Sequence, residues 1–118
     1  MKGYEECMGN GLLRKIPPSR QKAGESMKAA KNWIGEAEKN IQNQTFNSSV
    51  ISSYLAMFHS ARSILFKDGV REKSHFCIAR YLEEKYAKPG SLEQKWIDLL
   101  DYYRDLRHER PIQHKFFH

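Results

Sequence analysis

Long hydrophobic runs are missing from this chain of 118 residues. Although 40% of the residues are hydrophobic, no apolar run approaches the roughly 20 residues that a membrane-spanning helix needs. Residues 1–18 also lack the continuous apolar core of a secretory signal. The length suits one domain, because two separate cores would each bury too little surface. We therefore expect a single cytoplasmic domain without a membrane anchor.

Cysteine is scarce, and the known phosphate-loop motifs are absent. Cys7 and Cys77 stand alone, without the CxxC or Cys/His spacing of a zinc site. Their spacing indicates neither a disulfide framework nor a metal site, and we expect two unreactive thiols. Neither GxxxxGK[ST] nor GxGxxG occurs, which disfavours an ATPase or a dinucleotide enzyme. No cofactor is expected.

Basic residues outnumber acidic ones. The sequence has 20 lysines and arginines against 14 aspartates and glutamates, a net charge of +6. Such an excess favours an anionic partner, which could be nucleic acid, a nucleotide or an acidic protein. Charge alone does not choose among these three.

Apolar residues recur at helical spacing in four segments. The second segment has an apolar arc of about half the helix circumference, which is typical of a central helix. Ser74 can cap the third segment, the pair Ser91 and Gln94 forms a capping-box pattern for the fourth, and Pro111 is expected to end it. The expected helices are 20–43, 46–68, 74–86 and 91–110.

Short connections between these segments predict an all-α fold, an antiparallel, up-and-down four-helix bundle. No segment alternates with period two, so a sheet is not expected. Residues 1–18 contain Gly9, Gly11 and Pro17-Pro18 and are predicted to form a flexible leader. The bundle domain would then span 19–118, with room for a short helical turn at its C-terminal end.

The end of the fourth helix carries the most unusual stretch of the chain. Residues 102–115 contain three arginines and two histidines. Arg107 falls within the apolar arc of its helix, and Arg104 and His108 lie together on its flank. A guanidinium on the core side must meet a bound anion such as phosphate, a carboxylate of the protein itself or backbone carbonyls at a helix end.

Arginine and histidine together suit the cleavage of a phosphodiester. Histidine transfers protons near neutral pH, and arginine stabilises negative charge that develops on a phosphate. Without a metal, the natural reaction is attack by an RNA 2′-hydroxyl. The alternative is that His108, His114 and His118 are ordinary surface residues.

Further candidates lie outside this stretch. Arg62 could join Arg107 or form an ion pair inside the bundle, and Lys73 stands in a basic loop that could bind phosphate or simply be solvated. His59 and His75 are expected to be structural.

Three motifs together resemble a stand-alone prokaryotic HEPN domain: Ser53-Tyr-Leu-Ala-Met-Phe-His-Ser-Ala-Arg62, Lys73-Ser-His75 and Arg104-Asp-Leu-Arg-His108. The resemblance covers about residues 19–115. It implies a helical bundle that commonly dimerises and brings two arginine-histidine motifs to a shared cleft. Many members are metal-independent ribonucleases, and some are toxins beside a minimal nucleotidyltransferase antitoxin. Others bind nucleotide or RNA without catalysis.

The active members have an arginine followed, after four to six residues, by a histidine. By this resemblance Arg107 and His114 are the catalytic pair, and the pairing of Arg107 with His108 instead stays open. Arg104, His108, Arg62 and Lys73 are the candidates for binding phosphate or nucleotide. The four-residue spacing would need a histidine where this chain has Ile112. The tyrosine that antitoxins modify in toxin members is replaced by Phe116, so that control is not expected.

Three functions remain open at this point. The first is a toxin-like, metal-independent endoribonuclease that acts as a homodimer. The second is a non-catalytic nucleotide- or RNA-binding module that works with a nucleotidyltransferase. The third is a structural bundle in which the arginines form internal ion pairs.

Overall fold

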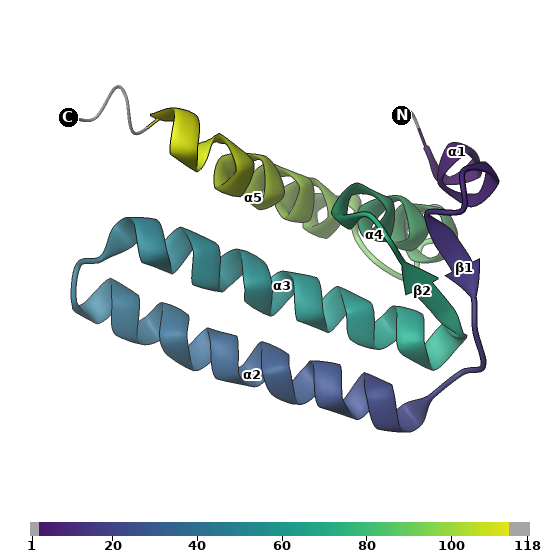
Figure 1. Cartoon of the computed structure of the whole chain (residues 1–118), viewed down its shortest axis with the longest axis horizontal. Coiled ribbons are helices and arrows are strands. Elements are labelled where there is room, and N and C mark those ends of the chain that lie inside the picture. The colour runs from purple at the N-terminus through teal and green to yellow at the C-terminus, as the bar shows by residue number, and fades with distance from the viewer. Residues whose placement is uncertain (1–2, 114–118) are drawn as a thin grey trace.

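The computed structural model describes the backbone of residues 3–113 and the side chains of residues 3–107. Within these bounds the chain forms five α-helices, one π-helical turn and two short strands (Figure 1). In order, the elements are α1 (Tyr4–Gly9), β1 (Leu13–Lys15), α2 (Arg20–Gln42), α3 (Phe46–Asp68), β2 (Val70–Glu72), α4 (His75–Leu82), η1 (Glu83–Ala87) and α5 (Gln94–Gln113). The expected all-α, bundle-like class is confirmed.

Helices α2 and α3 form a long antiparallel hairpin (Figure 1). Helix α2 begins where predicted, because the Ser19 hydroxyl accepts a hydrogen bond of 3.0 Å from the Lys22 N–H. Helix α3 ends at Gly69, whose φ of 82° is left-handed. A side chain there would also lie 2.7 Å from the Ile16 carbonyl oxygen, so this turn requires glycine.

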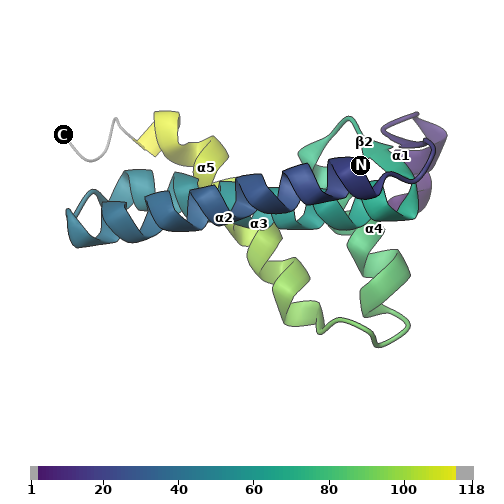
Figure 2. The same ribbon diagram turned by 90° about the horizontal axis from the view of Figure 1, so that it is seen from below.

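Helices α4 and α5 run across the α2–α3 hairpin rather than along it (Figure 2). Helix α3 contacts α2, α4 and α5, which agrees with the central position that its wide apolar arc predicted. The buried core gathers around it and includes Tyr54, Phe58, Leu65, Ile78 and Ile97.

The predicted bounds of the fourth helix are wrong at both ends. The N–H groups of Ser91 and Leu92 donate to the Tyr86 carbonyl, so both residues close a turn after η1, and α5 begins later, at Gln94. The helix also continues past Pro111 to Gln113. A proline removes one N–H donor and crowds the preceding turn, which strains a helix without having to end it.

The prediction that no sheet would form is also wrong. Strands β1 and β2 pair antiparallel, with Leu13 opposite Glu72 and Lys15 opposite Val70. Each strand has three residues, which is too short for an alternating pattern to appear in the sequence.

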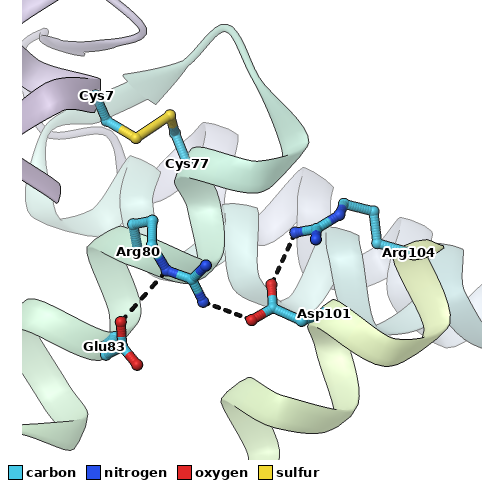
Figure 3. The surroundings of a disulfide bond; sticks show 6 residues. All are labelled: Cys7, Cys77, Arg80, Glu83, Asp101 and Arg104. Carbon is cyan, nitrogen blue, oxygen red and sulfur yellow. Dashed lines mark hydrogen bonds and ion pairs between the residues drawn. A yellow bond between two sulfur atoms is a disulfide. The ribbon is translucent and has the colours of Figure 1, made fainter. Parts of the chain in front are cut away.

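A disulfide joins Cys7 of α1 to Cys77 of α4 (Figure 3). This corrects the expectation of two separate thiols. It also corrects the expectation of an unstructured leader, because Cys7 and Leu13 are fully buried in the main core. The two cysteines are 70 positions apart, so their spacing carried no sign of the pairing.

Asp68, the last residue of α3, accepts hydrogen bonds from two phenols. The Tyr81 hydroxyl lies 2.9 Å and the Tyr86 hydroxyl 2.5 Å from Asp68 Oδ2. Burial and then the bond to Asp68 raise the pKa of both tyrosines, that of Tyr86 to about 12. Each phenol must therefore stay protonated beside the carboxylate for this contact to hold.

Alkaline pH should weaken the fold at this contact. Because the folded pKa values lie above the unfolded value of about 10, the contribution is complete below about pH 10 and is lost as pH rises through 12. We expect the urea midpoint to fall between about pH 9 and about pH 11.5. The Tyr81→Phe/Tyr86→Phe variant should lose less over the same range, and equal losses would contradict this assignment.

Candidate functional site

Arg107 lies at a point where three helices meet. Its Cζ atom is 4.9 Å from the centre of the Tyr54 ring on α3, and its Nη2 atom is 3.4 Å from Nδ1 of His75, the first residue of α4. The Tyr54 hydroxyl is 2.8 Å from the same Nδ1 atom. We call Tyr54, His75 and Arg107 the arginine cluster.

His75 is positioned by stacking as well as by hydrogen bonds. Its ring centre lies 4.1 Å from that of Phe58, with an angle of 28° between the planes. The sequence suggested that His75 was structural and did not connect it with Arg107. The pair spans 32 positions, and helical spacing relates residues only within one helix.

The contacts of His75 favour one tautomer of its ring. A guanidinium donates hydrogen bonds and accepts none, so Arg107 can bond to the Nδ1 atom only in the tautomer whose Nδ1 is unprotonated. In that tautomer the neutral ring carries its proton on Nε2. Burial raises the pKa of Tyr54 to about 12, so the phenol stays protonated and also donates to Nδ1.

Arg104 belongs to an ionic network beside this cluster. Asp101 accepts from Arg104 Nη1 at 2.7 Å and from Arg80 Nη2 at 2.5 Å (Figure 3). Arg104 also pairs with Asp105 at 3.0 Å, and Arg80 with Glu83 at 3.3 Å. Protein carboxylates already balance much of the charge of Arg104, and its role as a phosphate ligand stays a prediction.

Arg62 forms the internal ion pair that the sequence left open. Its Nη2 and Nε atoms lie 2.5 Å and 3.1 Å from Oε2 of Glu72. Glu72 is 5% exposed, and its strand β2 is held by β1. The guanidinium also lies 4.5 Å from the Phe58 ring centre, the same ring on which His75 stacks.

Arg62→Ala should therefore destabilise the fold. It leaves the Glu72 carboxylate buried without its cation, and we expect a loss of about 2 kcal/mol, reduced from the value for a fully buried pair because Arg62 is partly solvated. Urea denaturation measures the loss. Arg62→Ala/Glu72→Ala should lose less than the two single losses added together. Additive losses would mean that the ion pair contributes nothing.

Among the described residues, no hydrogen bond or ion pair joins the Lys73 side chain to the arginine cluster. The Lys73 side chain is exposed, and its N–H donates to the Leu12 carbonyl at 2.8 Å. The side chain of His108 and all of His114 lie outside the described residues. The pairings of Arg107 with either histidine therefore stay predictions.

An apolar groove of about 530 Å³ runs along the other side of α3, between α2 and α5. Ile34, Ile41 and Trp96 belong to the apolar spacing of their helices, yet they line this groove and are 49%, 54% and 50% exposed. The physical reason is that α2 packs mainly on α3, which covers only part of its apolar face.

The described residues contain neither a membrane-spanning helix nor a cluster of metal ligands. None of these helices combines the length and the hydropathy that crossing a membrane requires. In the same part of the chain, no three histidine, cysteine, aspartate or glutamate side chains come together as a metal site would need.

The comparison with protein families agrees with the motifs of α3, α4 and α5. The model of the HEPN domain matches residues 23–112, from the first turn of α2 almost to the end of α5. No curated protein and no solved structure matches the chain significantly. Since the matched segment is most of the chain and contains all three residues of the arginine cluster, the chain belongs to the HEPN domain family.

Proposed function

We propose that this HEPN protein binds the RNA backbone at the arginine cluster and cleaves RNA without a metal, as a toxin-like endoribonuclease. One observation carries the proposal: the Arg107 guanidinium lies 3.4 Å from His75 Nδ1, in a half-buried position that three helices define. Two nitrogen-rich side chains held side by side suit a phosphate.

The chemistry is transesterification within the RNA. A base removes the proton of a 2′-hydroxyl, whose oxygen attacks the adjacent phosphorus. The bond to the 5′-oxygen breaks, and an acid protonates that oxygen, which leaves a 2′,3′-cyclic phosphate and a free 5′-hydroxyl. Arg107 would bind a non-bridging phosphate oxygen, where negative charge accumulates in the transition state.

The histidines would have different roles. His75 would hold the Arg107 guanidinium in place at the phosphate, because its Nδ1 atom lies 3.4 Å from Arg107 Nη2. We assign proton transfer to His114. In a homodimer, a cleft shared by two copies would bring a second Arg107 and a second His114 to the same substrate.

A second function is RNA or nucleotide binding without cleavage, beside a minimal nucleotidyltransferase partner. This binding function is favoured by the contacts of His75, whose Nδ1 atom lies within hydrogen-bond distance of both Tyr54 and Arg107. A ring whose Nδ1 accepts these two bonds does not act as a base at that atom, so the arginine cluster alone supports binding.

Incubation of single-stranded RNA in excess chelator with the wild type and with His114→Ala tests the choice. The endoribonuclease predicts cyclic-phosphate products from the wild type and none from the variant. Saturable binding without products, equal for both proteins, would select the binding module. Equal cleavage by both would remove the role of His114.

A mixture of variants tests the shared cleft. If Arg107 of one copy acts with His114 of the other, mixing inactive Arg107→Ala and His114→Ala proteins should restore part of the cleavage. No recovery in mixed dimers, confirmed by subunit exchange, would place both residues of a working site on one copy.

A further inference from the structure

A second basic site lies where α2, α3 and β2 meet, away from Arg107. It is a cleft of about 280 Å³, and we call it the basic pocket. Lys22 from α2, His59 and Arg62 from α3 and Arg71 from β2 line it, together with Glu25, Ser26, Ala29 and Phe66. Burial and then the nearby Arg62 lower the pKa of His59, which therefore adds a hydrogen-bonding group but little charge near neutral pH.

The basic pocket has more positive charge than its own carboxylates balance. Lys22 Nζ and Arg71 Cζ lie 5.8 Å and 5.6 Å from the centre of the Phe66 ring. Among the described residues, neither cation has a carboxylate within ion-pair distance. Glu25 also lines the pocket, and its carboxylate accepts a hydrogen bond from Gln21 at 3.4 Å. Its single negative charge offsets only one of the two cations of Lys22 and Arg71.

Hydrogen bonds hold the walls of this pocket together. The Ser63 hydroxyl donates to the Ala23 carbonyl at 2.8 Å, and the Ser19 N–H donates to the Phe66 carbonyl at 2.9 Å. Both bonds join the first turn of α2 to α3. Arg71 is placed by pairing with Arg14 in the two-stranded sheet. Lys22 and Arg71 therefore emerge from fixed backbone positions near one aromatic ring, as a preformed anion site requires.

We propose that the basic pocket binds a phosphate group, and that in RNA this is a phosphate on the same strand as the one at Arg107. The two sites share Phe58, since His75 stacks on its ring and the Arg62 guanidinium lies 4.5 Å from its centre. Tyr54, Phe58 and Arg62 follow one another at four-residue spacing and form one face of α3. The assignment to RNA rests on the proposed function, whereas the affinity for phosphate rests on the pocket alone.

Titration with inorganic phosphate, followed by backbone-amide NMR, tests the pocket by itself. We expect saturable shifts at residues 22, 59 and 71, and affinity at least about tenfold lower in Lys22→Gln/Arg71→Gln. The control is Lys28→Gln/Lys31→Gln, which removes two charges from exposed positions of α2 outside the pocket. Equal phosphate binding by the two double variants would overturn the proposal.

The salt dependence of binding to a single-stranded oligoribonucleotide tests the RNA assignment. Losing the one phosphate contact at the pocket should reduce the slope of log K against log salt by about 0.7 in the pocket variant but not in the control. Phosphate binding with an unchanged slope would overturn the RNA assignment and leave a site for small phosphorylated molecules. A third outcome is that RNA binding does not change in Arg107→Ala but becomes weaker in the pocket variant. This would overturn the proposed function and leave the phosphate site in the basic pocket supported.

Discussion

Arg107→Ala should lower the rate of RNA cleavage in excess chelator by a factor of about 10² to 10³, the usual effect of removing one donor to a developing anion. The expected reason is the loss of the guanidinium that Tyr54 and His75 hold in place. Arg107→Lys should recover part of the rate, because lysine keeps the charge but not the planar set of donors. Product formation from a labelled oligoribonucleotide measures each rate.

The matched control is Lys39→Ala, which removes one charge from an exposed position of α2 outside the arginine cluster. It should cleave RNA at the rate of the wild type. Thermal unfolding of every variant separates a chemical effect from loss of the fold. An Arg107→Ala protein that folds normally and still cleaves RNA would remove the arginine cluster from the reaction.

Loss of the disulfide should have the largest effect on stability. Cys7→Ser/Cys77→Ser removes a covalent link between positions 70 apart, so the unfolded chain gains conformational entropy. We expect the free energy of unfolding to fall by about 3 to 4 kcal/mol. Guanidinium denaturation of the oxidised and reduced wild type beside the variant measures it. The reduced wild type and the variant should unfold at similar midpoints, well below that of the oxidised protein.

The N-terminal elements should respond most to this change. Helix α1 packs on α4, and the disulfide joins the same two helices. Amide exchange in α1 and β1 should therefore increase on reduction more than exchange in the α2–α3 hairpin. Identical stability and exchange in the oxidised and reduced protein would show that noncovalent packing of Leu13 and its neighbours holds this segment.

Local signals were sufficient to predict the helical hairpin. The apolar spacing, Ser19 as a cap and the Asp68-Gly69 stop placed α2 and α3 within a residue or two of their observed bounds. Such features act between residues a few positions apart, and the sequence displays them directly. The same kind of reasoning placed α5 too early, because the turn that Ser91 and Leu92 close on Tyr86 belongs to the loop before it.

The sequence by itself determined the all-α class, the central helix and the excess of positive charge. It also predicted Arg107 as a residue of the functional site. The tertiary structure alone decided that Cys7 meets Cys77, that β1 pairs with β2, that Arg62 belongs to Glu72, and that Arg107 lies beside His75. The physical reason is the separation along the chain between the residues that interact. Periodicity and capping are local properties of the chain, whereas each of these contacts joins separate elements whose approach depends on how the helices pack.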